Sequence, residues 1–169
     1  MLTLAFALVI ALTTALAGCG LQAPFPSWPT CNDQELACDD YKVFLQDWHA
    51  EVQPPEGAPY SSPKEWRIQD GAAADVDGDG KCELVLIAWR QSNFGSSTPF
   101  WKQNDTIEWT QHLFILRPGP TELEPVWMTS ELGMEVQNMR TTGNRIELVD
   151  RNGNHTLWEW LSWGLTLVE

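Results

Sequence analysis

The chain has 169 residues, which is enough for one domain with a hydrophobic core. Its 10 basic and 23 acidic residues give a formal net charge of −13. That charge argues against nucleic acid or anionic lipid headgroups as ligands, because their phosphates would repel it. The 10 tryptophans are an excess that fits either packing in a sheet protein or a platform on which sugars stack.

Residues 1–18 are expected to form a signal peptide. The segment from Leu2 to Leu16 is almost wholly apolar or Thr and is too short to span a bilayer comfortably. Leu16-Ala17-Gly18-Cys19 resembles a bacterial lipobox, which implies removal of the signal peptide and acylation of Cys19. The alternative is an ordinary secretory signal in which Cys19 is incidental. Both alternatives place the domain outside the cytoplasm, and the lipobox implies a lipid anchor in a bacterial cell membrane.

Residues 19–38 are expected to be a lipidated tether followed by a small disulfide loop. Three prolines between Gly20 and Thr30 favour an extended tether. Cys31 and Cys38 bracket six residues, a loop that closes easily in an oxidising compartment, so the sequence predicts a disulfide between them. Cys82 is then left over and is expected to be a small buried side chain rather than a reactive thiol.

Residues 39–65 are expected to hold a short helix and a proline-rich loop. Asp39 and Asp40 can cap a helix, and apolar residues follow from Tyr41 at offsets of 0, 3, 4, 7 and 11, the spacing of a helical face. The residues at these offsets are Tyr41, Phe44, Leu45, Trp48 and Val52. Four prolines between Gln53 and Lys64 indicate a loop there.

From residue 66 to residue 169 short strands alternate with turn residues, so the predicted fold class is mainly all-β. The expected strands form two antiparallel four-stranded units, with 66–74, 83–89, 112–116 and 123–129 in the first and 135–140, 145–150, 156–160 and 165–168 in the second. The run 83–89 is apolar at nearly every position, as expected for a strand that is covered on both faces. Two successive units of this kind predict an internal repeat.

The loop Asp75-Val-Asp-Gly-Asp-Gly-Lys-Cys-Glu83 lies between the first two of these strands and carries the clearest chemistry. Asp75, Asp77 and Asp79 stand two residues apart, and the intervening glycines allow a tight turn that directs their carboxylates inward. Four carboxylates within nine residues repel one another, which a hard divalent cation relieves. The sequence therefore predicts one structural Ca²⁺, held by these three residues, the carbonyl of Lys81 and the carboxylate of Glu83.

The spacing distinguishes this loop from an EF-hand, whose twelfth position requires a bidentate Glu, because Leu86 stands there. The alternative is a solvated hairpin turn without an ion. In the second unit the corresponding point is Gly143-Asn144, which lacks carboxylates, so a second ion is not expected.

The string from Asp75 to Leu86 resembles the calcium motif of FG-GAP or VCBS-type repeats, which are the blades of integrin-alpha-like β-propellers, and the match covers residues 66–90. Other stretches resemble a group of bacterial lipoproteins that carry such repeats. They are Trp89-Arg90, Asn93-Phe94-Gly95, Pro99-Phe100-Trp101, Asn104-Asp105, His112-Leu-Phe-Ile115 and Val126-Trp127-Met-Thr-Ser130. The resemblance implies propeller-blade-like sheets in which the ion stabilises a hairpin, and a propeller face that binds other proteins or glycans.

A closed propeller usually needs four or more blades, whereas the sequence after Glu65 supplies two. The chain could form an open stack of two blades with the N-terminal helix covering one face, or it could close by association. Open sheet edges also offer a route to self-association.

The leading hypothesis for function is a non-catalytic, calcium-stabilised, membrane-anchored module that binds a protein or a glycan. Its candidate contact residues lie in the long segment 91–111 and are Phe94, Phe100, Trp101 and Trp109. A packed flap over a sheet edge explains the same segment without a ligand. The other hypotheses are a hydrolase of cell-envelope polymer and an architectural lipoprotein of an envelope complex. The histidines are scattered and no serine lies in a nucleophile elbow, so an enzyme is not favoured.

Overall fold

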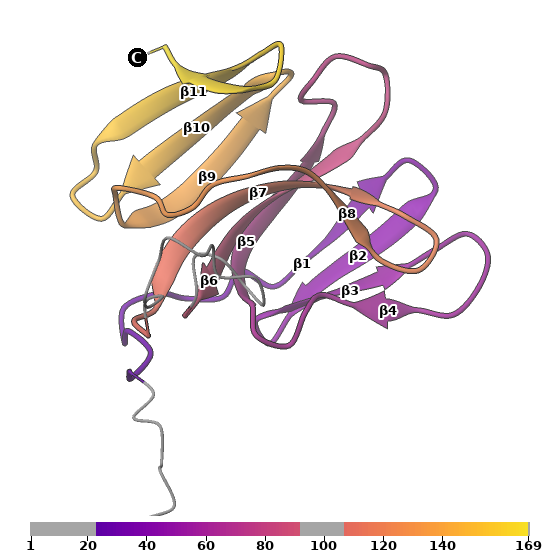
Figure 1. Cartoon of the computed structure of the whole chain (residues 1–169), viewed down its shortest axis with the longest axis horizontal. Coiled ribbons are helices and arrows are strands. Elements are labelled where there is room, and N and C mark those ends of the chain that lie inside the picture. The colour runs from indigo at the N-terminus through magenta and orange to yellow at the C-terminus, as the bar shows by residue number, and fades with distance from the viewer. Residues whose placement is uncertain (1–22, 92–106, 169) are drawn as a thin grey trace, which may run out of the picture.

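The computed structural model describes residues 23–91 and 107–168, which form three antiparallel four-stranded sheets (Figure 1). The first sheet contains β1 (Gln34–Cys38), β2 (Tyr41–Gln46), β3 (His49–Gln53) and β4 (Tyr60–Ser61). The second contains β5 (Arg67–Ala74), β6 (Glu83–Arg90), β7 (Thr110–Pro118) and β8 (Leu123–Met128). The third contains β9 (Val136–Thr142), β10 (Arg145–Asp150), β11 (His155–Leu161) and β12 (Gly164–Leu167). No described residue is helical, and so none belongs to a helix that could cross a membrane.

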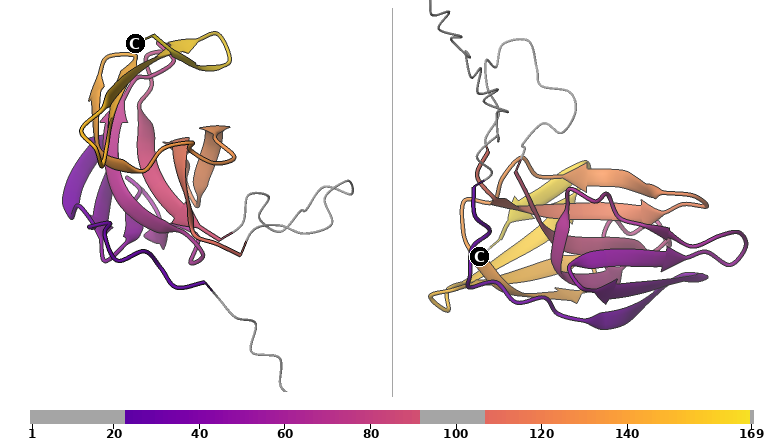
Figure 2. Two further views of the ribbon diagram at one scale, coloured as in Figure 1. Left: turned by 90° about the vertical axis from the view of Figure 1, so that its left-hand side faces the viewer. Right: turned by 90° about the horizontal axis from the view of Figure 1, so that it is seen from below.

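The second sheet lies between the other two, and each of its faces is buried (Figures 1 and 2). On β6 the side chains alternate between two hydrophobic clusters. Leu84 and Leu86 pack toward the first sheet, while Val85 and Ile87 pack toward the third. All four are fully buried, as expected for an apolar strand with successive side chains on opposite faces. The prediction that this strand is covered on both faces is confirmed.

Strands form where the sequence places them from residue 67 onward, with ends that differ by a few residues. Each of the three sheets is a meander in which consecutive strands pair. The first strands of the sheets are neighbours, since β5 packs beside both β1 and β9. The prediction of a mainly β architecture is therefore confirmed, but the structure has three four-stranded sheets where the sequence predicts two.

The additional sheet contains residues 41–52, for which the sequence predicts a helix. That prediction is wrong. Buried side chains alternate along two paired strands there, with Val43 and Leu45 on β2 and Ala50 and Val52 on β3. The turn between them, Asp47-Trp48, has φ values of 50° and 68°, the left-handed conformation that a two-residue hairpin requires. Apolar residues at offsets of 3 and 4 also fit two short strands joined by a tight turn, so the spacing alone was ambiguous.

The predicted disulfide between Cys31 and Cys38 is also wrong, because Cys38 pairs with Cys82 at a Cα–Cα distance of 5.2 Å. Cys38 ends β1 and Cys82 precedes β6, and packing of the first sheet on the second brings these points together. The thiol of Cys31 is free and half-buried, and its sulfur accepts an N–H bond from Trp48 at 3.3 Å. Burial raises the pKa of Cys31 to about 11.

Because all three sheets are meanders, their loops fall at two opposite ends of the molecule. The acidic end carries the β5–β6 loop with residues 75–82, together with the β1–β2 turn, whose Asp39 carboxylate accepts an N–H bond from Cys82 at 3.1 Å. The aromatic end carries Phe25, Trp28, Trp48, Trp89 and Trp109, whose rings contact one another. In Figure 1 the first described residues, drawn in indigo, lie at the aromatic end.

A buried polar network at the start of β9 joins the second and third sheets. Gln69 on β5 and Gln111 on β7 both donate to the carbonyl of Val136, at 3.0 and 2.8 Å. Gln111 also accepts the N–H of Val136 at 2.7 Å, and Trp89 donates its indole N–H to Gln69 at 2.7 Å. Each of these buried polar groups therefore has a partner, so the network fixes where β9 begins without an unsatisfied amide.

Peptide mapping without reduction should recover Cys38 linked to Cys82 and Cys31 free. The Cys38→Ala/Cys82→Ala double variant should lose about 2–4 kcal/mol of stability, because the bridge closes a loop with a sequence separation of 44. Native Cys31 should react with iodoacetamide roughly 100-fold more slowly than an ordinary thiol at pH 8, since its raised pKa lowers the thiolate fraction. A link between Cys31 and either partner, or rapid alkylation of Cys31, would contradict this assignment.

Candidate functional site

The acidic loop is shaped by hydrogen bonds from its own backbone. Asp75 follows the last residue of β5, and its two carboxylate oxygens accept the N–H groups of Gly78 at 2.7 Å and Gly80 at 3.0 Å. Both glycines have positive φ, 78° and 84°, which an L side chain would strain. The alternation of Asp and Gly therefore produces a loop that folds back around its first carboxylate.

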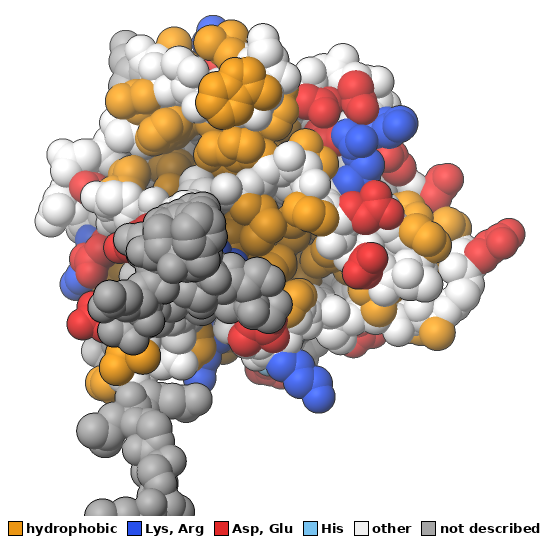
Figure 3. Space-filling view, viewed as in Figure 1, with side chains coloured by type: hydrophobic (Ala, Val, Ile, Leu, Met, Phe, Trp, Pro, Cys, Tyr) orange, Lys and Arg blue, Asp and Glu red, His pale blue; other side chains and the backbone are white. Residues whose placement is uncertain are grey.

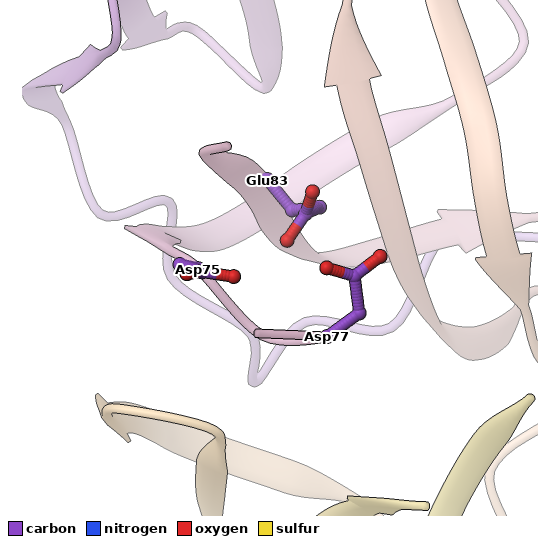
Figure 4. Close-up of side chains that lie close together, drawn as sticks. All are labelled: Asp75, Asp77 and Glu83. Carbon is purple, nitrogen blue, oxygen red and sulfur yellow. The ribbon is translucent and has the colours of Figure 1, made fainter. Parts of the chain in front are cut away.

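Three of the five predicted calcium ligands come together in this loop. Asp75, Asp77 and Glu83 each offer a carboxylate oxygen, and these oxygens lie within 4.8 Å of one another. Figure 4 shows the three carboxylates turned toward a common space. Glu83 is fully buried, and one of its oxygens accepts the N–H of Val76 at 3.0 Å. Converging carboxylates, one of them buried, fit a hard divalent cation with oxygen ligands.

The other two predicted ligands, Asp79 and Lys81, do not belong to this group of converging carboxylates. Asp79 is not part of the converging group, because one of its oxygens accepts the N–H of Lys81 at 2.8 Å and the other faces Arg117 at 3.2 Å. Lys81 has an exposed side chain in the same loop. Asp79 and Lys81 are both exposed, on either side of Gly80 with its positive φ.

Arg117 is the site residue that sequence reasoning missed. Its guanidinium is hydrogen-bonded to the buried carboxylate of Glu83 and lies 3.2 Å from Asp79 and 3.5 Å from Asp77. These contacts, with the Glu83 hydrogen bond foremost, raise the pKa of Arg117. Leu84 on β6 pairs with Leu116 on β7, which places Arg117 beside Glu83. Knowledge of the strand register would therefore have identified Arg117 as a site residue. Arg117 therefore neutralises part of the negative charge of the acidic loop.

At the aromatic end, Phe25 is surrounded by tryptophans and by a cation. Its ring contacts Trp48, Trp89 and Trp109 edge-on at centroid distances of 5.1, 5.5 and 5.2 Å. The guanidinium of Arg67 lies 4.4 Å from the Phe25 ring centroid and 4.9 Å from that of Trp109. The part of the predicted tether that the structure describes is therefore packed against the domain.

Of the predicted contact residues, Trp109 lies in this aromatic end and is half-buried, with its indole N–H donated to the carbonyl of Ala23 at 3.1 Å. Phe94, Phe100 and Trp101 lie outside the described residues, as does Cys19. A cleft of about 460 Å³ opens beside Trp109 and is bordered by Pro26, Leu132, Met134 and Arg151. Its walls mix apolar and charged groups, a combination that suits a polar ligand with an apolar face.

A second cleft, of about 370 Å³, lies where the β11–β12 hairpin meets β8, and it is lined by Trp127, Leu161, Trp163 and Leu165. Gly164 lies against the indole of Trp127, so closely that a Cβ at this position would stand 2.8 Å from Nε1. The absence of a side chain at Gly164 therefore lets the hairpin pack on Trp127. As a result the side chains of Leu161 and Trp163 remain at the surface, exposed to 55% and 84%.

His112 is the histidine that opens the apolar strand 112–116 in the sequence. Its side chain is fully buried, with one ring nitrogen 2.9 Å from the hydroxyl of Thr110 and the other 3.2 Å from the carbonyl of Thr129. Both nitrogens have partners inside the sheet. This arrangement is typical of a structural histidine.

A scan against protein-family models finds no match to this chain, and searches among curated proteins and among solved structures find none either. The geometry of the acidic loop and of the two clefts therefore carries the functional interpretation.

In the absence of divalent ions, Arg117→Gln should lower the free energy of unfolding by roughly 1–3 kcal/mol, because it leaves the buried carboxylate of Glu83 without its cation. Arg145→Gln is a matched control, since Arg145 forms an exposed pair with Glu159 at 3.8 Å and should change stability by less than about 0.5 kcal/mol. Denaturant unfolding in the presence of a chelator measures both values. Equal stability of the two variants would show that Arg117 does not hold the acidic loop together.

Proposed function

We propose that the chain is a non-catalytic binding module that is anchored to the outer face of a bacterial cytoplasmic or outer membrane by a lipid on Cys19 and stabilised by one Ca²⁺. Its partner is a protein or a glycan. The lipobox resemblance at Leu16 to Cys19 supports the anchor. The converging carboxylates of Asp75, Asp77 and Glu83 support the ion. Each four-stranded sheet is inferred to be one blade-like unit of the FG-GAP or VCBS type.

The blade interpretation is supported by the position of the turns. The acidic loop joins the first two strands of the second sheet, and Asp39-Asp40 and Gly143-Asn144 lie at the same point of the first and third sheets. The outer face of the third sheet carries charged pairs. Arg145 faces Glu159 there, and Glu147 faces His155. Such a face favours a stack that ends in solvent over one that closes into a ring with a second copy.

The observation that carries the binding function is an exposed apolar surface on the β11–β12 hairpin. Leu161, Trp163, Leu167 and Val168 are exposed to 55%, 84%, 52% and 51%. Figure 3 shows hydrophobic side chains gathered over the third sheet and continuing toward the second. Several large exposed apolar side chains on one hairpin mark an interaction site more often than a single exposed residue does. The mixture of aliphatic and aromatic side chains favours a protein partner, with Trp163 as its central contact.

Calcium should raise the melting temperature of the purified protein by several degrees. With an assumed dissociation constant of about 0.1 mM and about 1 mM free ion, linkage gives roughly 1.4 kcal/mol of stabilisation. Asp77→Asn should abolish the response because it removes one of the converging carboxylates. Arg117→Gln should bind calcium on the order of tenfold more tightly, because a competing cation is removed. Isothermal titration with CaCl₂ measures the affinities, and an unresponsive wild type would leave only the hairpin-turn alternative.

A photo-reactive residue that replaces Trp163 should cross-link to a partner on intact cells. A matched probe at Ile107, which is 63% exposed and lies at the aromatic end, should not give the same product. The cross-link should disappear when Leu161 and Leu167 are both changed to Ser, provided that the melting temperature is unchanged. Identical products from both positions, or a cross-link that survives the double change, would argue against the hairpin as the contact surface.

A further inference from the structure

The aromatic end holds the first described residues of the chain in fixed contacts. The carbonyl of Ala23 accepts N–H groups from Trp109 at 3.1 Å and from Gln91 at 3.3 Å. Phe25 is enclosed by aromatic rings, and Trp28 packs on Trp89 with a centroid distance of 5.5 Å. From Ala23 onward the chain is therefore packed against the sheets.

Only four peptide links join Ala23 to Cys19. A fully extended chain spans at most about 3.3–3.6 Å per residue, so these links reach no further than about 14 Å. This distance is shorter than a single strand of the domain, since β5 has eight residues and extends about 26 Å. A lipid on Cys19 would consequently hold the aromatic end close to the bilayer.

The acidic end lies far from that point. β5 starts at Arg67, whose guanidinium contacts Phe25, and ends at Ala74, directly before the acidic loop. The carboxylates of the loop therefore stand about one strand length from the aromatic end. An anionic lipid surface would repel these carboxylates. This repulsion acts in the same direction as the short connection.

We propose that the aromatic end, where Phe25, Trp28, Trp48 and Trp109 are half-buried around the buried Trp89, faces the membrane and lies next to the lipid headgroups. This inference depends on the proposed anchor at Cys19. The cleft beside Trp109 then faces the bilayer, and the acidic loop and the β11–β12 hairpin point away from it. The hairpin is thereby presented to partners at the distance of a whole domain from the membrane.

Two turns of the third sheet provide a matched pair of probes. Asn152 lies in the β10–β11 turn at the aromatic end, where the neighbouring Arg151 contacts Trp28, and Asn144 lies in the β9–β10 turn at the opposite end. Both side chains are exposed, and the six residues of β10 separate the turns by about 20 Å. Asn152→Cys and Asn144→Cys, each made together with Cys31→Ser, allow one fluorophore to be attached at either end.

The full-length acylated variants should be incorporated into phosphatidylcholine vesicles that contain a small fraction of lipid with a nitroxide on its headgroup. The fluorophore at position 152 should be quenched at least several-fold more strongly than the one at position 144. Insertion of about 12 Gly and Ser residues between Gly20 and Leu21 should reduce that difference, because the domain is no longer held by a short connection. Cys19→Ala protein should not float with the vesicles.

The outcomes separate this inference from the anchor on which it depends. Equal quenching at the two positions, or stronger quenching at position 144, in protein that floats would overturn the orientation and leave the anchor intact. Wild-type protein that fails to float, or that floats as well after Cys19→Ala, would overturn both the anchor and the orientation.

Discussion

The structure depends on the burial of both faces of the second sheet. Along β6, Leu84, Leu86 and Ala88 face one hydrophobic cluster and Val85 and Ile87 face the other, so this sheet cannot be stable without a layer on each side. The first and third sheets supply these layers. The disulfide between Cys38 and Cys82 links the first sheet to the second. The hydrogen bonds of Gln69 and Gln111 with Val136 link the third sheet to the second.

The same strand also places the chemistry of the acidic end. β6 begins at Glu83, so a fully buried carboxylate lies directly behind the acidic loop and needs a counter-charge. Arg117 supplies one from the neighbouring strand, and a divalent cation would supply another through Asp75 and Asp77. A site that already contains an arginine should bind a divalent cation less tightly than carboxylates alone.

The meander topology places the aromatic residues at one end of the molecule and the acidic loop and the β11–β12 turn at the other. Phe25 and the tryptophans around it close the end at which the chain enters the domain, and they convert a predicted tether into part of the fold. The acidic loop and the exposed β11–β12 hairpin with Trp163 occupy the opposite end. The two ends of the described domain therefore differ in chemistry, one being aromatic and the other acidic.

Local pattern in the sequence determined the strands from residue 67 onward, the two-sided burial of β6 and the turning of the acidic loop, because each depends on neighbouring residues and on the period of two. Spacing alone could not distinguish the helix predicted over 41–52 from the β2–β3 hairpin, since the decision rests on packing against Leu84 and Leu86. The pairing of Cys38 with Cys82, the position of Arg117 beside Glu83 and the enclosure of Phe25 join residues far apart in the chain. Only the tertiary structure decided these contacts, because they are set by how the sheets stack.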